Sequence, residues 1–167
     1  MNRYLTEIYT DGSCHTNYCM GAWAAVILAG DKKSLIKGGA QNTTHNRMEL
    51  LAVIKAVGFA VENHKDASLI VYTDSQYVFR IPERKEKLKR NHFLTKKGTP
   101  IQNADLVQEL ISQIESYTIQ FIKIKAHQKL ITAEPDIHAT YNSEVDKLVR
   151  QMVRDAVKNV DRQTTGC

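Results

Sequence analysis

Apolar and polar residues along the chain follow two different periods, which divide it into strands and helices. Residues 4–10 and 21–29 are rich in β-branched, aromatic and small apolar residues, a composition that is typical of strands. The turn sequence Asp-Gly-Ser at 11–13 predicts a loop, and a second turn is predicted at 30–31. Residues 34–38 then return as a third strand. We expect these three strands to form an antiparallel meander.

The pattern changes to a helical period over residues 46–62. Apolar residues recur there every three or four positions and form one stripe, made of Leu50, Ile54, Val57 and Val61. Thr43 or Thr44 is predicted to cap this helix. A continuous apolar run at 69–73 is typical of a buried central strand. Because a strand–helix–strand connection is a right-handed crossover, we expect 69–73 to lie parallel to 4–10.

The rest of the chain alternates again between helices and a strand. The predicted elements are a helix over 75–92 that Pro82 breaks, a basic loop over 93–102, a helix over 105–116, a strand over 118–124, a polar loop over about 128–141 and a last helix that ends near Lys158. Asn142 or Ser143 is predicted to cap the last helix. The sequence contains no internal repeat and no linker. It therefore predicts one α/β domain over 1–158 and a flexible C-terminal tail over 159–167.

Length and composition agree with a globular protein. A chain of 167 residues is long enough to bury a core, and its apolar content of 43% argues against disorder. No apolar run approaches the roughly 20 residues that cross a bilayer, and the first residues lack the apolar segment of a signal peptide. We therefore expect a cytoplasmic protein without membrane contact. The three cysteines, at 14, 19 and 167, have no regular spacing and predict no disulfide framework.

The formal net charge of +5 permits a polyanionic partner. Basic residues gather in one stretch, namely Lys85, Lys87, Lys89, Arg90, Lys96 and Lys97. A run of like charge can bind phosphates, but it can equally be a solvated face of the protein.

Four acidic residues lie where the predicted fold can bring them together. Asp11 and Asp74 follow two strands that we expect to be parallel neighbours, and α/β sheets place their active sites at the carboxyl ends of strands. Glu49 lies early in the connecting helix, and Asp146 lies in the first turn of the last helix. Each also has an ordinary interpretation, respectively as a turn residue, a helix cap, a solvated helix residue and a favourable charge at a helix start.

Carboxylates that converge on one patch need cations. Two carboxylates about 4 Å apart repel by roughly 4 kcal/mol at an effective dielectric of 20, so four stay ionised only beside cations. Magnesium and manganese prefer oxygen ligands, and a set without cysteine or a central histidine favours them over zinc. Two such ions can drive an in-line phosphodiester displacement. His127, just after the strand at 118–124, can shuttle a proton or be an ordinary surface residue.

Four segments that contain these acidic residues resemble the signature segments of type I ribonuclease H, in the same order and at similar spacing. They are residues 9–14 around Asp11, 44–50 around Glu49, 72–78 around Asp74 and 142–148 around Asp146. The resemblance covers about residues 4–157. It implies a five-stranded mixed sheet, with an antiparallel meander plus parallel strands, flanked by helices. It also implies an endoribonuclease that hydrolyses the RNA strand of RNA–DNA hybrids and leaves 5′-phosphate and 3′-hydroxyl ends, and we expect the protein to be a monomer.

The resemblance further implies a role for each matching residue. The catalytic and metal-binding set is Asp11, Glu49, Asp74 and Asp146, which would hold two Mg²⁺ ions, with Mn²⁺ as a substitute, and His127 matches the catalytic histidine of a flexible loop. Asn17, Asn46 and Gln76 would face the RNA strand, where side-chain amides can reach 2′-hydroxyls. Thr44 and Asn103 are similar to residues that hold a phosphate of the DNA strand. Each of these polar residues can otherwise serve a turn or a cap.

The sequence departs from the family pattern in three places. Residues 15–21 are not glycine-rich, and the segment 128–145 is longer than usual. The basic stretch at 83–90 carries no tryptophan, which predicts a grip on DNA that depends on charge and falls steeply with salt. Two other functions stay open: a DNA nuclease of the resolvase or transposase type on the same fold, and a module that binds hybrids without cutting them.

Overall fold

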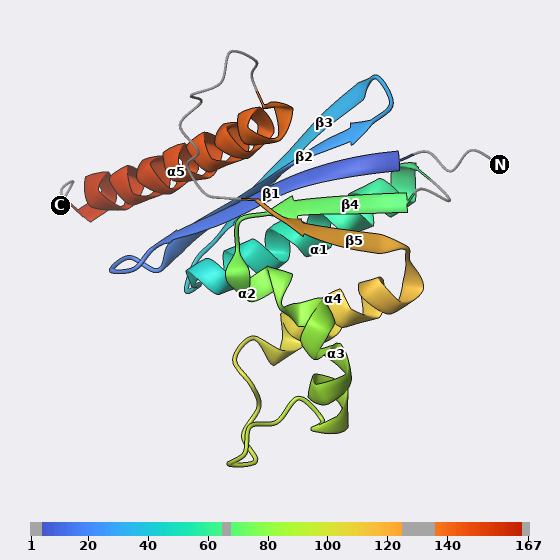
Figure 1. Cartoon of the computed structure of the whole chain (residues 1–167). Helices are drawn as coiled ribbons and strands as arrows, with labels where there is room; N and C mark the ends of the chain where they lie inside the picture. Colours follow the sequence, from blue (N-terminus) through green and yellow to red (C-terminus); the bar gives the residue numbers. More distant parts are fainter. Residues whose placement is uncertain (1–4, 65–67, 125–135, 165–167) are drawn as a thin grey trace.

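The computed structural model describes residues 5–64, 68–124 and 136–164 as a five-stranded sheet with helices on both faces (Figure 1). The strands are β1 (Leu5–His15), β2 (Met20–Ala29), β3 (Lys32–Ala40), β4 (Ser68–Thr73) and β5 (Ile119–Lys123). They lie in the order β3-β2-β1-β4-β5. The first three pair antiparallel, whereas β4 pairs parallel with both β1 and β5. This arrangement confirms the predicted fold class.

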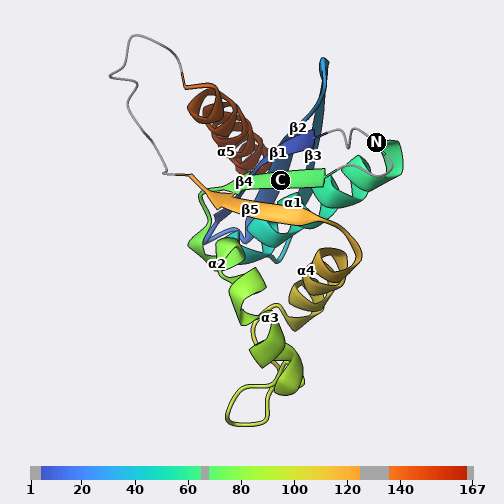
Figure 2. The same ribbon diagram turned by 45° about the vertical axis from the view of Figure 1, so that its right-hand side comes forward.

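The helices separate onto the two faces of the sheet (Figures 1 and 2). They are α1 (His45–Asn63), α2 (Gln76–Phe79), α3 (Ile81–Arg90), α4 (Ala104–Ser116) and α5 (Ile137–Thr164). One core joins Ile8 of β1 to α1 and α4. A second core joins Tyr9 of β1 to α5. Because successive side chains of a strand point to opposite faces, β1 lies between the two cores. None of the helices in the described ranges is long and apolar enough to cross a membrane.

Helix α1 forms as predicted from its apolar stripe. Leu50, Ile54 and Val57 are buried in the core beneath it. Its N-cap is Thr44, whose side chain accepts a hydrogen bond of 3.4 Å from the backbone N–H of Arg47. The cap therefore falls on one of the two predicted threonines and sets where Glu49 stands in the helix.

Strand β1 continues through residues 11–13, where the sequence predicted a loop. Asp11, Gly12 and Ser13 pair with residues 24, 23 and 22 of β2. A glycine is needed at position 12 because the strand lies directly against α1: a Cβ atom there would overlap the backbone of Met48 and Glu49. The turn sequence is thus explained by a close approach of helix and strand rather than by a turn.

Helix α5 begins at Ile137, earlier than the predicted start, and ends at Thr164, beyond the predicted end near Lys158. Neither Asn142 nor Ser143 is its cap. Instead the side chain of Asp136 accepts a 3.0 Å hydrogen bond from the N–H of His138, as an N-cap does. Asp146 consequently lies in the third turn of α5 and not in the first.

The interruption of the predicted helix over 75–92 falls at Arg80, which separates α2 from α3. Pro82 does not break a helix but lies in the first turn of α3. A proline is tolerated there because the first N–H groups of a helix have no partner within the helix. The prediction of a break was confirmed, and its position was wrong by two residues.

Strand β3 forms one edge of the sheet, and the outer side of the strand carries charge. Its exposed residues include Lys32, Lys33 and Lys37. Lys33 reaches across to α5, where its ammonium group binds both carboxylate oxygens of Glu144 at 2.8 Å.

Candidate active site

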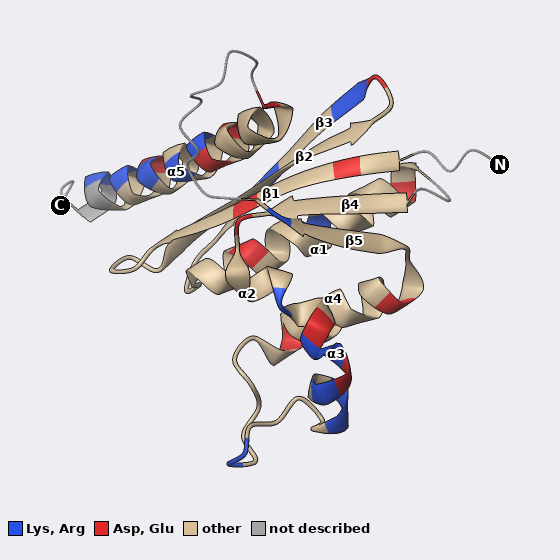
Figure 3. Ribbon diagram, viewed as in Figure 1, with Lys and Arg blue, Asp and Glu red and all other residues tan. Residues whose placement is uncertain are grey.

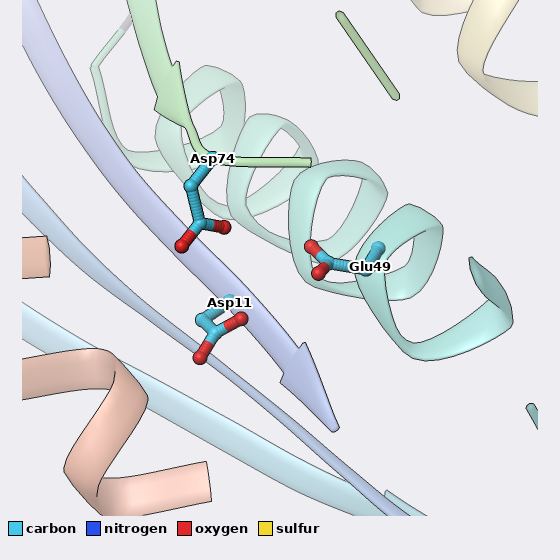
Figure 4. A group of neighbouring side chains, drawn as sticks. All are labelled: Asp11, Glu49 and Asp74. Carbon is cyan, nitrogen blue, oxygen red and sulfur yellow. The ribbon is translucent and has the colours of Figure 1, made fainter. Parts of the chain in front are cut away.

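Three carboxylates meet beside the carboxyl end of β4, as Figure 4 shows. One oxygen of each of Asp11, Glu49 and Asp74 lies within 4.8 Å of the others. Asp11 belongs to β1, Asp74 directly follows β4, and Glu49 projects from α1. The parallel register pairs Tyr9 with Tyr72, so that Asp11 and Asp74 each stand two residues beyond a paired position. Sequence and pairing together therefore bring the two aspartates side by side.

The side chains of Asp74, Glu49 and Asp11 do not have the cap, solvated-helix and turn roles that the sequence also allowed. The N-cap of α2 is Ser75, which accepts a bond from Val78, so Asp74 is free of that role. Glu49 is not a solvated helix residue, because its Oε2 is buried and has no hydrogen-bond partner among the described residues. Asp11 is 7% exposed and accepts a 2.8 Å hydrogen bond from the N–H of Gly12.

Burial and mutual repulsion change the acidity of the cluster. Burial, then Asp74, then Asp146 raise the pKa of Asp11 to about 7, while Gly12 and Arg150 act in the opposite direction. Burial, followed by Asp11 and Asp74, raises the pKa of Glu49 well above its usual value, and Lys123 opposes this rise. Such a cluster resists full ionisation. Its oxygen-only donors and the unpartnered oxygen of Glu49 fit a hard divalent cation.

Asp146 lies near this trio without belonging to it. Its charge acts on Asp11, but it is not one of the three residues whose oxygens lie within 4.8 Å of one another. Its Oδ1 accepts a 2.7 Å hydrogen bond from Nε of Arg150, one turn later in α5. The structure therefore gathers three of the four predicted carboxylates and brings the fourth within electrostatic reach.

The residues predicted to face the RNA strand lie on segments that border the cluster. Asn17 is exposed in the turn between β1 and β2, and Gln76 is exposed as the first residue of α2. Asn46 is half-buried in the first turn of α1, three residues before Glu49. Asn46 and Gln76 thus lie close in sequence to Glu49 and Asp74, whereas Asn17 lies in the turn beyond the end of β1. His127 lies outside the described residues.

Arg47 joins the two residues predicted to hold a DNA phosphate. Its backbone N–H bonds the hydroxyl of Thr44, and its Nη1 donates to Oδ1 of Asn103 over 3.4 Å. The same guanidinium group makes two bonds, of 2.9 and 2.8 Å, to the carboxylate of Asp105. Asn103 has a left-handed backbone with φ of 57° just before α4. Arg47 therefore ties the start of α1 to the start of α4.

Two cations at the site were not predicted from the sequence. Nζ of Lys123 donates a 2.8 Å hydrogen bond to the backbone oxygen of Asp74, and its charge opposes the raised pKa of Glu49. Arg150 holds Asp146 and acts on Asp11. The sequence does contain a signal for each residue. Arg150 stands four residues after Asp146 on one helix. Lys123 ends the strand beside the one that Asp74 follows.

Removing one charge from the cluster is expected to stabilise the metal-free protein. The folded pKa of Asp11, about 7, exceeds the ordinary value of 3.8, so its ionisation lowers the free energy of unfolding as pH rises from about 4 to 7. At pH 8 in chelator, Asp11→Asn should therefore have a free energy of unfolding about 2 kcal/mol higher than the parent, which corresponds to a melting temperature about 4–8 °C higher. Near pH 4 the variant and the parent should differ little. Asp31→Asn, in an exposed turn, is the control in calorimetric melts. A lower melting temperature for Asp11→Asn at pH 8 would show that repulsion between the ionised carboxylates does not destabilise the metal-free protein.

Comparison with known proteins identifies the family to which this chain belongs. The sequence model of the RNase H family matches residues 3–154. A ribonuclease H of Thermoanaerobacter sp. (strain X514) is 35% identical over 152 residues, 90% of each chain. One from Marinobacter nauticus is 36% identical over 149 residues, 89% of this chain and 93% of that protein.

Solved structures share the fold at low sequence identity. The N-terminal RNase H domain of a Mycobacterium tuberculosis protein, solved as a fusion with maltose-binding protein, superposes with a TM-score of 0.68 at 16% identity, covering 94% of this chain and 99% of that one. A foamy viral protease-reverse transcriptase, in complex with dsDNA, gives a TM-score of 0.70 at 22% identity, covering 89% and 93%. The family match and the close relatives together show that this chain belongs to the ribonuclease H family of nucleases.

Proposed function

We propose that this enzyme hydrolyses the RNA strand of RNA–DNA hybrids and that Asp11, Glu49, Asp74 and Asp146 hold two Mg²⁺ ions, which Mn²⁺ can replace. The observation that carries the proposal is the meeting of three carboxylates from three different elements within 4.8 Å, in a member of the ribonuclease H family. When bound, such ions supply activation of a water molecule and stabilisation of the leaving oxygen. The proposed products carry 5′-phosphate and 3′-hydroxyl ends.

Other residues of the protein position the proposed metal ligands. Lys123 holds the backbone of Asp74 and favours the ionised form of Glu49, and Arg150 orients Asp146 from the same helix. Gly12 lets α1 approach β1 closely enough for Glu49 to reach the two aspartates. His127 stays the predicted proton shuttle at the leaving group. The cytoplasmic location and the monomeric state also stay predictions from the sequence.

The RNA strand and the DNA strand of the hybrid would contact two different surfaces of the protein. Asn17, Asn46 and Gln76 would contact the RNA strand beside the carboxylates, where 2′-hydroxyls distinguish RNA from DNA. Thr44 and Asn103, joined by Arg47, would hold a phosphate of the DNA strand. Basic side chains on α3 and in the loop after it would extend this contact (Figure 3). One part of a foamy viral protease-reverse transcriptase, 20% of that chain, shares the fold with a TM-score of 0.67 at 21% identity, and that protein was solved in complex with RNA/DNA hybrid.

The test compares strand-labelled substrates. We expect the enzyme to cut the RNA strand of a hybrid in Mg²⁺, to leave duplex DNA intact and to stop when a chelator is added. Mass spectrometry of the fragments should show 5′-phosphate and 3′-hydroxyl ends. Preferential cleavage of duplex DNA would instead support a resolvase-type or transposase-type nuclease. Tight binding of the hybrid without cleavage, in any divalent cation, would support a binding module.

A further inference from the structure

Four aromatic rings lie between the sheet and the first two turns of α5, beside the carboxylates. The rings of Tyr9 and Tyr72 are stacked, with centroids 4.7 Å apart and planes at 5°. His138 stacks on Tyr72 at 4.5 Å, and Tyr141 lies 5.1 Å from Tyr9. The hydroxyl of Tyr9 and Nδ1 of His138 share a 2.8 Å hydrogen bond. The start of α5 is therefore fixed to the sheet by both ring contacts and a polar bond.

This cluster is adjacent to the proposed metal site. Tyr9 stands two residues before Asp11 on β1, and Tyr72 stands two residues before Asp74. Side chains two apart on a strand share a face, so Tyr9 and Asp11 both point toward α5. The hydroxyl of Tyr72 is itself held, because it donates a 3.0 Å hydrogen bond to Glu7. The surface that receives His138 is thus held by ring stacking and a hydrogen bond, and it includes the strand that carries Asp11.

Helix α5 transmits the position of its first turns to Asp146. His138, Tyr141 and Val145 are three or four residues apart, so they lie on one face of the helix, and Val145 is fully buried. Asp146 is the next residue. Its carboxylate is bonded to Arg150 of the same helix. Where that carboxylate stands relative to Asp11 therefore depends on how α5 is seated on the sheet.

A second tether acts on the outer side of the same helical segment. The ammonium group of Lys33 binds Glu144 at 2.8 Å and lies 5.1 Å from the centre of the Tyr141 ring. Lys33 and Glu144 are both partly exposed, so this pair is screened by solvent and contributes less than the buried contacts. The aromatic contacts at His138 are consequently the stronger constraint on this part of α5.

We propose that His138 is a positioning residue, which seats α5 on Tyr9 and Tyr72 so that the Asp146 carboxylate faces Asp11 and completes the metal site. The proposal rests on the proposed function, because the position of Asp146 matters when both carboxylates hold the same ions. Truncating His138 removes the hydrogen bond and the stack, while Val145 and Val149 keep the helix packed. The fold should then persist with Asp146 less well placed.

The experiment measures Mg²⁺ affinity directly as well as cleavage. In His138→Ala, we expect the dissociation constant for Mg²⁺, from titration calorimetry, to rise by up to about tenfold, because His138 acts on Asp146 only through α5 and direct partners of metal ligands change affinity by about tenfold or more. The Mg²⁺ concentration for half-maximal hybrid cleavage should rise in parallel. KM for the hybrid should stay within about twofold, and saturating Mg²⁺ should restore kcat. Tyr9→Phe, which keeps the stack but loses the hydroxyl, should show a smaller shift in the same direction. His64→Ala, at the C-terminal end of α1, is the matched control.

Several results would overturn the proposal. One is a His138→Ala protein that is folded by circular dichroism and binds Mg²⁺ as the parent does. Another is a fall in kcat that saturating Mg²⁺ does not restore, because that would give His138 a direct chemical role. If His138→Ala does not fold, an unchanged Mg²⁺ affinity in Tyr9→Phe decides against positioning. A parent protein that neither binds Mg²⁺ nor cleaves hybrid would instead refute the proposed function.

Discussion

Asp74→Asn is expected to reduce cleavage of the hybrid at least about 10³-fold and to change hybrid affinity by less than about threefold. Asparagine has nearly the same shape, so the hydrogen bond from Val78 to Ser75 that caps α2 should remain. What is lost is one negative charge and one carboxylate oxygen from a trio that lies within 4.8 Å. A metal ion contributes several kcal/mol to stabilising a phosphoryl transition state, and about 4 kcal/mol corresponds to 10³ in rate.

Single-turnover cleavage in saturating Mg²⁺ measures the chemistry of this variant, and fluorescence anisotropy in chelator, where the parent should not cut, measures hybrid binding. Asp31→Asn removes the same charge in an exposed turn and serves as the control. It should cleave at the parental rate. Near-normal turnover by Asp74→Asn would remove Asp74 from the proposed metal site, and a large loss of hybrid affinity would show that the residue acts mainly in binding.

Among substitutions that add a single methyl group in the region of the site, Gly12→Ala is expected to be the most destabilising. The added Cβ would overlap the backbone of Met48 and Glu49, which cannot move aside as a flexible side chain can. Helix α1 must therefore shift from β1, at a cost of about 3 kcal/mol or more, the upper end of overpacking. The melting temperature should fall by about 6–12 °C. Cleavage should also fall, because Glu49 moves with the helix.

Gly58→Ala is the matched control for this prediction, because it lies inside the same helix. A Cβ there would meet no atom within 4 Å. Alanine is favoured over glycine in a helix interior by up to about 1 kcal/mol, so this variant should melt at or slightly above the parental temperature. Equal melting temperatures for Gly12→Ala and the parent would show that α1 and β1 are less closely packed than the structure indicates.

The sequence predicted the strand order near the site because periodicity and chain connectivity together determine it. A buried strand at 69–73, a crossover helix and a first strand at 4–10 leave one parallel arrangement, and that arrangement places Asp11 beside Asp74. The predicted loop at 11–13 was wrong because the turn tendency of Asp-Gly-Ser is local. Pairing with β2 and contact with α1 are tertiary effects that override it.

The start of α5 could not be predicted for a related reason. Asp136, Asn142 and Ser143 are all good caps, and nothing local distinguishes them. The difference comes from Tyr9 and Tyr72, far away in sequence, which offer the first turns of the helix a surface to pack on. The raised pKa of Asp11 likewise depends on burial and on two residues far away in sequence, Asp74 after β4 and Asp146 on α5.

The lysines of β3 affect whether a strand from another molecule can pair with this edge of the sheet. An edge strand presents unpaired N–H and C=O groups to which a strand from another molecule can add, which is a route to aggregation. A second molecule joining at β3 would bring its backbone beside Lys32 and Lys37, and two copies meeting edge to edge would place these like charges near one another. Because Glu144 holds Lys33 toward α5 and balances its charge, Lys33 contributes little to this repulsion. The edge is thus protected by charge, and the sheet ends at β3.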